Sequence, residues 1–203
     1  MLEIRFHGRG GQGTVVATIL LAKAFFRAGY QVQSFPFFGV ERRGAPVEAY
    51  VRLDKEKILL RTNVYYPDYV VVQDQTLLHG VNVTSGLKPG GWVLINSSAA
   101  PANREPFIGF RLAFVDANGI ALRNGLGTRT HPIVNTAMIG AFARMIDMPP
   151  LDAIRDVIRE EIPDMYTQNI SAAEDAYNDV QLVGLIESIN SPDAANHLEG
   201  NTA

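Results

Sequence analysis

The 203-residue chain is long enough for one compact domain, and its 47% hydrophobic and 19% charged residues exclude global disorder. The absence of cysteine excludes a disulfide, a thiolate zinc site and an iron–sulfur cluster held by this chain. The net charge is −3, but residues 1–61 carry ten Lys or Arg against five Asp or Glu, whereas residues 142–203 carry three against twelve.

No apolar run reaches the length of a membrane span, and the segment MLEIRFHG lacks the pattern of a signal peptide. We therefore expect a cytoplasmic protein that binds neither a membrane nor nucleic acid. We interpret the acidic end, residues 142–203, as solvated helix faces.

The first half of the chain alternates strand and helix patterns. Leu2–Phe6 is predicted to be a strand, and Thr14–Ala28 a helix that ends at Gly29. Apolar residues cover most of the circumference of this helix, which predicts that it is largely buried. Further strands are expected at Gln31–Phe35, Val47–Leu53 and Lys57–Leu60, the last pairing with residues 47–53 across a turn.

The second half begins with strands and ends with helices. Residues 68–73 and Trp92–Asn96 are apolar runs typical of buried parallel strands, and Arg111–Val115 is expected to be the last strand. The predicted helices are Pro132–Met148, Leu151–Glu161 and Ala172–Ser188. This order indicates an α/β fold, a three-layer α/β/α sandwich with a Rossmann-like, mostly parallel sheet and an antiparallel component. We assign residues 1–190 to one domain and residues 191–203 to a flexible tail.

The motif HGRGGQG, residues 7–13, lies between the first strand and the first helix. Glycines there allow backbone N–H groups at a helix N-terminus to approach an anion, and Thr14 adds a hydroxyl. The spacing also matches the dinucleotide fingerprint, but no Asp or Glu follows the second strand to hold a ribose. A Walker loop is excluded because no Gly-Lys-Ser/Thr follows. A further alternative is that the glycines only permit tight strand–helix packing.

The segment FPFFGVERRGAP, residues 35–46, is too long and too aromatic for an ordinary connector. Arg42 and Arg43 stand beside Gly44, where they are suited to clamp phosphates, including the 2′-phosphate of an NADP-like ligand. Contact with a neighbouring chain is an equally good interpretation. 

Other polar residues have simpler interpretations. We interpret His7 as a satisfied residue at a strand end, Asp74 as a helix cap and Asn135 as a partner for the sheet backbone. No Ser/His/Asp or Cys/His set and no ligand-spaced histidines are evident, so we expect neither catalytic residues nor a metal site in this chain.

Three segments together resemble the gamma subunit of 2-oxoacid:ferredoxin oxidoreductases, which act on pyruvate, ketoisovalerate and aryl 2-oxoacids. They are HGRGGQG, then FPFFGVERRGAPVEAYVR over residues 35–52, and NTAMIGAFAR over residues 135–144. The resemblance covers roughly residues 1–185. It implies a complex that decarboxylates a 2-oxoacid, forms its acyl-coenzyme A and reduces ferredoxin, or NAD through a further subunit.

The resemblance also implies a division of labour within that complex. Thiamine diphosphate, magnesium and iron–sulfur clusters belong to partner subunits of alpha, beta and delta type, and this chain contributes to coenzyme A binding and assembly. The implied coenzyme A residues are Gly8, Arg9, Gly10, Gly11, Gly13, Thr14, Arg42, Arg43 and Gly44. A purely architectural subunit and a nucleotide-dependent oxidoreductase are the alternatives.

Overall fold

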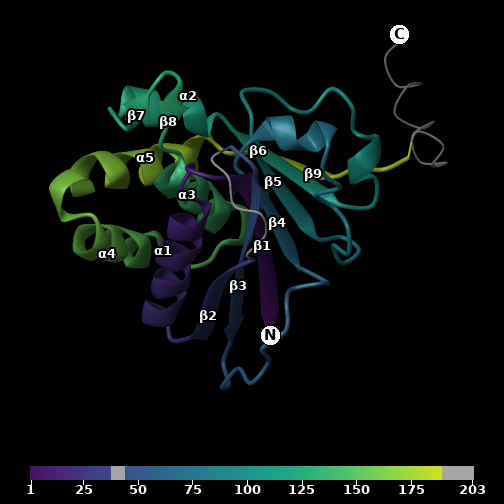
Figure 1. Cartoon of the computed structure of the whole chain (residues 1–203), viewed down its shortest axis with the longest axis horizontal. Coiled ribbons are helices and arrows are strands. Elements are labelled where there is room, and N and C mark those ends of the chain that lie inside the picture. Colours follow the sequence, from purple (N-terminus) through teal and green to yellow (C-terminus); the bar gives the residue numbers. More distant parts are fainter. Residues whose placement is uncertain (38–43, 189–203) are drawn as a thin grey trace, which may run out of the picture.

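The computed structural model describes residues 1–37 and 44–188, which form a mixed seven-stranded sheet with helices packed on it (Figure 1). The strand order is β2-β3-β1-β4-β5-β6-β9. The strands are β1 (Leu2–Arg9), β2 (Gln31–Phe37), β3 (Pro46–Asp54), β4 (Tyr69–Val72), β5 (Trp92–Asn96), β6 (Arg111–Val115) and β9 (Gln181–Leu185).

Five of the seven strands run in one direction. β1, β4, β5 and β6 pair in parallel, and β2 has the same direction because β3 lies antiparallel between it and β1. β9 is antiparallel to β6 at the other edge. The predicted α/β class and the mostly parallel sheet with an antiparallel component are therefore confirmed.

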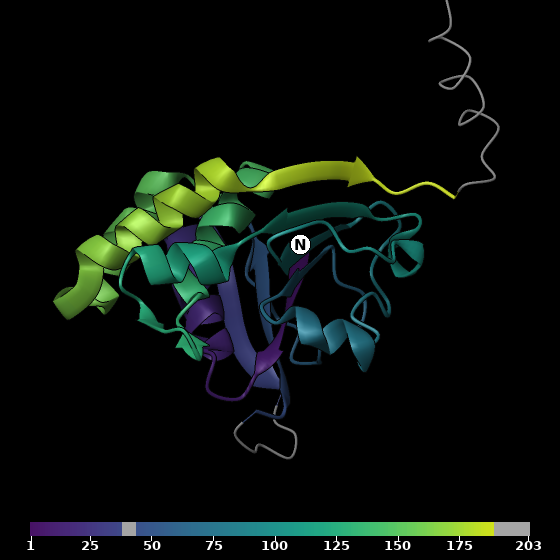
Figure 2. The same ribbon diagram turned by 90° about the horizontal axis from the view of Figure 1, so that it is seen from above.

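The α-helices gather on one face of the sheet, and the short 3-10 helices η1 (Gln75–His79) and η2 (Glu105–Phe107) with long loops cover the other (Figure 2). Ile4 and Phe6 of β1 point into the helical side, whereas Val70 and Val72 of β4 point into the other side, as the twofold alternation of strands requires. The α-helices are α1 (Thr14–Arg27), α2 (Ala117–Arg123), α3 (Asn135–Ile146), α4 (Leu151–Glu161) and α5 (Tyr166–Asp179). The 3-10 helices are η1 (Gln75–His79), η2 (Glu105–Phe107) and η3 (Pro163–Met165), and β7 (Gly127–Thr128) pairs with β8 (His131–Pro132).

Three sequence predictions about elements are wrong. Residues 57–60 form no strand, and Arg111–Val115 is not the last strand of the sheet. The predicted helix over 172–188 ends at Asp179, after which the chain turns at Val180 into β9. β9 is an exposed edge strand, so the alternation between buried and exposed residues that marks a half-buried strand is missing from its sequence.

The prediction that the first helix is largely buried holds for eight of its fourteen residues but fails on one outer face. Phe25 is buried in the core, but Val16, Ile19 and Phe26 are 45%, 41% and 63% exposed. Spacings of three and seven residues place these three side chains on one outer face of α1. Apolar residues thus cover the circumference as the sequence indicates, but only one face packs against the sheet.

Within the described ranges, no helix is both long enough and apolar enough to cross a membrane.

Candidate functional site

The glycine motif connects the carboxyl end of β1 to the start of α1, the edge of a parallel sheet at which α/β proteins bind ligands. Gly11 and Gly13 have φ values of 92° and 74°, so both occupy the left-handed region that favours glycine. Gly10 instead extends the β1–β3 ladder: its N–H donates to Ala45 at 2.9 Å, and its carbonyl accepts from Gly44 at 3.1 Å. The glycine motif and the end of the 35–46 segment therefore form one unit.

At Gly8 the strand and the helix lie very close together. A Cβ at this residue would lie 2.1 Å from Thr14 Oγ1 and 2.9 Å from Gln73 Oε1. Both side chains are almost fully buried, at 3% and 1% exposure. Among the described residues, Thr14 Oγ1 and both amide atoms of Gln73 have no hydrogen-bond partner. Such buried polar atoms cost roughly 1–3 kcal/mol each when unsatisfied, so their presence beside a helix N-terminus points to a ligand or water.

α1 begins without a side-chain cap, because its N-cap residue is Gly13. The first backbone N–H groups of a helix lack partners within the helix, and its dipole favours negative charge there. The N-terminus of α3 lies close by: a Cβ on Gly13 would be 3.3 Å from Asn135 Nδ2. Asn135 Oδ1 accepts from the N–H of Thr136 at 2.8 Å, so the prediction that Asn135 bonds the sheet backbone is wrong.

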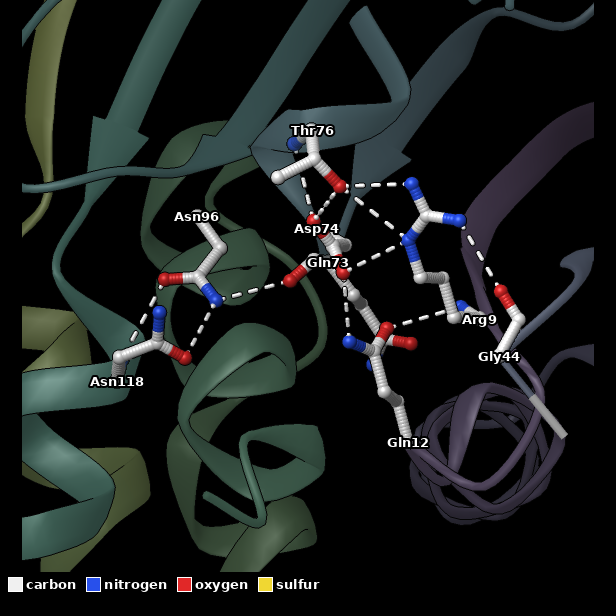
Figure 3. A network of polar contacts seen from close by, with 8 residues as sticks. All are labelled: Arg9, Gln12, Gly44, Gln73, Asp74, Thr76, Asn96 and Asn118. Atoms are coloured by element: carbon white, nitrogen blue, oxygen red, sulfur yellow. Dashed lines mark hydrogen bonds and ion pairs between the residues drawn. The ribbon is translucent and has the colours of Figure 1, made fainter. Parts of the chain in front are cut away.

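Arg9 ties the end of β1 to neighbouring segments (Figure 3). Its Nε donates to Asp74 Oδ2 at 3.2 Å, its Nη2 to Thr76 Oγ1 at 2.8 Å and its Nη1 to the carbonyl of Gly44 at 3.0 Å. All three guanidinium nitrogens therefore have protein acceptors. This arrangement gives Arg9 a role in holding the loop together, in addition to its positive charge at the site.

Asp74 is the centre of this network. It follows Gln73, the first residue after β4. It caps η1 by accepting from the N–H of Thr76 at 2.9 Å, which confirms the predicted helix cap. It also accepts from Thr76 Oγ1 at 2.6 Å and from Gln12 Nε2 at 2.8 Å. Burial opposes its charged form, but these hydrogen bonds and the Arg9 guanidinium hold the pKa of Asp74 below its usual value.

A second, uncharged group of contacts lies at the neighbouring strand ends (Figure 3). Asn96, the last residue of β5, donates from Nδ2 to the carbonyl of Gln73 at 2.9 Å and to Asn118 Oδ1 at 3.1 Å. These bonds join the ends of β4 and β5 to the start of α2. They hold the strand ends beside Gly8 in a fixed geometry.

His7 faces the side of the sheet away from the α-helices and is 2% exposed. Its Nε2 accepts from Arg5 Nε at 3.0 Å, and its Nδ1 lies 3.5 Å from Glu48 Oε1. The prediction that His7 has hydrogen-bond partners is confirmed, but β1 continues to Arg9, so His7 lies within the strand and not at its end. Burial, with the Arg5 charge adding to it, lowers the pKa of His7 to about 3, so the imidazole is neutral at physiological pH.

The structure brings Gly8, Arg9, Gly10, Gly11, Gly13, Thr14 and Gly44 together at one edge of the sheet. Arg42 and Arg43 lie outside the described residues. Sequence reasoning missed Gln12, Gln73 and Asn96. For Gln73 and Asn96, the available signal was a polar side chain at the end of an apolar run that is typical of a parallel strand. In the described part of the chain, no three His, Cys, Asp or Glu side chains gather as metal ligands.

Fold and site together define an α/β protein with a glycine loop opening a helix at the carboxyl edge of its sheet. The chain belongs to the pyruvate ferredoxin/flavodoxin oxidoreductase family, whose model matches residues 3–178. Within it, the chain is a gamma subunit of the 2-oxoacid:ferredoxin oxidoreductase type, part of a multi-subunit oxidoreductase complex, which confirms the resemblance stated above.

This chain matches known relatives over nearly the whole length of each. The chain is 50% identical to pyruvate synthase subunit PorC of Methanocaldococcus jannaschii, covering 89% of this chain and 97% of the relative. It is 47% identical to the pyruvate/ketoisovalerate oxidoreductases common subunit gamma of Thermococcus kodakarensis, covering 88% and 96%. The crystal structure of pyruvate oxidoreductase subunit PORC from Thermotoga maritima matches with a TM-score of 0.78 at 34% identity, covering 90% and 98%.

Proposed function

We propose that this gamma subunit binds the diphosphate of coenzyme A at its glycine loop, in a complex that converts a 2-oxoacid to its acyl-coenzyme A. The observation that carries the proposal is the buried, unpartnered Thr14 hydroxyl in the first turn of a helix without a side-chain cap. Coenzyme A carries a diphosphate and a 3′-phosphate, and backbone N–H groups at a helix N-terminus suit such an anion.

The remaining chemistry is assigned to partner subunits of alpha, beta and delta type. They would hold thiamine diphosphate with magnesium for decarboxylation and the iron–sulfur clusters that pass electrons to ferredoxin. This chain has no cysteine for a cluster. Its part is to bind and orient the acyl acceptor, with Arg42 and Arg43 supplying charge to the remaining phosphate.

The test is calorimetric titration of the whole complex with coenzyme A. Thr14→Val keeps the shape of the side chain and removes the hydroxyl, and we expect about tenfold weaker binding, equivalent to roughly 1.4 kcal/mol. Thr18→Val is the matched control, because Thr18 is buried one turn further along α1 and bonds the carbonyl of Val15. Thr14→Ser should restore affinity.

Arg42→Ala/Arg43→Ala tests the second motif in the same titration. Unchanged coenzyme A affinity and unchanged acyl transfer in both this variant and Thr14→Val would reject the proposal.

An architectural subunit without a ligand is the second candidate, and the engagement of Arg9 with Asp74, Thr76 and Gly44 favours it. It predicts that Thr14→Val leaves coenzyme A binding intact. It also predicts that substitutions in the Arg9 network release this subunit from the complex, a loss that analytical ultracentrifugation measures.

A further inference from the structure

A cavity of about 930 Å3 opens beside η1, on the face of the sheet away from the α-helices. Its floor is apolar, because Val83, Ile95 and Phe107 contribute to its lining and are each at most 3% exposed. The volume lies in the range of small-molecule sites, which combine apolar walls with a few polar groups.

No Asp, Glu, Lys or Arg is among the described residues that line this cavity, whose polar side chains are amides, hydroxyls and the imidazole of His79. Asn82 Oδ1 accepts from Thr84 Oγ1 at 3.0 Å, and Asn103 Oδ1 accepts from the N–H of Glu105 at 3.0 Å. With both oxygens engaged, the side-chain NH2 groups are the atoms suited to donate to a ligand. The cavity therefore suits an uncharged group that carries hydrogen-bond acceptors.

The cavity lies next to the glycine loop. Thr76 is part of its lining and accepts from Arg9 Nη2 at 2.8 Å, and Asp74 links Thr76 to Gln12 (Figure 3). Direct hydrogen bonds therefore join the loop to the wall of the cavity, which makes the cavity a neighbour of any ligand whose phosphates bind at the loop.

We propose that this cavity binds the adenine ring of coenzyme A, an inference that rests on the proposed function of the glycine loop. Adenine is flat and uncharged, its ring nitrogens accept hydrogen bonds, and Asn is a side chain that pairs well with its edge. The thiol end of coenzyme A must extend to the partner subunits, because the decarboxylation that supplies the acyl group is assigned to them. The nucleotide end is therefore the part that binds to this chain.

The test compares three probes on the whole complex: coenzyme A, adenosine 3′,5′-bisphosphate and pantetheine 4′-phosphate. Ala102→Trp fills the cavity that Ala102 lines, and Ala99→Trp is the control, because Ala99 is exposed in the same loop outside the lining. We expect Ala102→Trp to lower the affinity for coenzyme A and for adenosine 3′,5′-bisphosphate at least tenfold, without changing the affinity for pantetheine 4′-phosphate. Ala99→Trp should bind all three probes as the wild type does.

Three results would overturn the adenine site. One is wild-type affinity of Ala102→Trp for both adenosine-containing probes. Another is selective loss of pantetheine 4′-phosphate, which would place the arm of coenzyme A in the cavity. The third is dissociation of the Ala102→Trp complex, which would make the cavity a contact for another subunit.

Thr14→Val separates failure of this inference from failure of the proposed function. Weaker coenzyme A binding in Thr14→Val together with unchanged binding in Ala102→Trp rejects only the adenine site. The reverse pattern rejects the loop as the diphosphate site, and adenosine 3′,5′-bisphosphate binding then identifies the cavity as a nucleoside site on its own.

Discussion

Arg9 and Asp74 join the ends of two parallel strands, with Arg9 Nε donating to Asp74 Oδ2 at 3.2 Å. The carboxylate also accepts from Gln12 and from both donors of Thr76. One side chain thus holds the glycine loop, the end of β4 and the start of η1 together.

We expect Asp74→Ala to lower the free energy of unfolding by about 2 kcal/mol, because it removes a cap and several charge-assisted hydrogen bonds. Asp74→Asn should lose less, since its side-chain oxygen can still accept from the N–H of Thr76. Urea denaturation of the full chain measures both. Equal stability of Asp74→Ala and the wild type would contradict the central role of this carboxylate.

The glycines of the loop should differ in their tolerance of alanine. Gly8→Ala is expected to cost most, about 3 kcal/mol, because its Cβ would overlap the buried Thr14 and Gln73 side chains. In Gly11→Ala the added Cβ has no neighbouring atom within 4 Å. The free energy of unfolding should therefore fall by only about 1 kcal/mol, because of the positive φ at this residue. Gly13→Ala should fall between them, since it combines a positive φ with crowding of Asn135.

Denaturation midpoints of the three alanine variants, measured side by side, test this order. A Gly8→Ala variant as stable as Gly11→Ala would show that strand and helix do not pack as closely as described.

His7 makes the stability depend on pH. Its pKa is about 3 in the folded protein against 6.5 for an unperturbed histidine, so the unfolded state binds more protons between these values. The free energy of unfolding should therefore fall as the pH decreases through this window, by up to about 1.4 kcal/mol per pH unit.

Denaturation of the wild type and of His7→Gln between pH 6.5 and pH 5 isolates this contribution from that of the carboxylates. His7→Gln should show a flatter pH dependence, whereas His79→Gln, at an exposed position, should follow the wild type. Identical slopes for the wild type and His7→Gln would exclude His7 as the cause.

Two adjacent phenylalanines test the orientation of α1. Phe25 is fully buried, and Phe26 is 63% exposed. Phe25→Ala should cost about 3–5 kcal/mol, whereas Phe26→Ala should change the stability by less than about 0.5 kcal/mol. Thermal unfolding of the full chain distinguishes them, and similar losses in both variants would mean that α1 is buried on all sides.

The sequence predicts the parts of the fold that local patterns specify. Apolar runs identify β4 and β5, and the glycine motif identifies the junction of β1 and α1. The orientation of α1 is not predictable in this way, because apolar residues surround the helix and only the packing decides which face is buried. β9 was missed because an exposed edge strand lacks the alternation that marks a half-buried one.

The candidate site was predictable to a similar extent. The motif identifies the loop residues, but the contacts of Asp74 with Arg9 and Gln12 depend on β1 and β4 being neighbours, which follows from the strand order. The cavity is formed by residues 75–84 together with residues from β5 to η2, and no local pattern in either segment indicates that they meet.

The bonds of Asn96 to Gln73 and Asn118 contain no ionised group. Added salt screens the Arg9–Asp74 pair but has little effect on neutral amide bonds. Acid that protonates Asp74 would likewise leave Asn96 and its two partners unchanged. High ionic strength and low pH should therefore loosen the glycine-loop side of this edge first, while the ends of β4 and β5 stay joined.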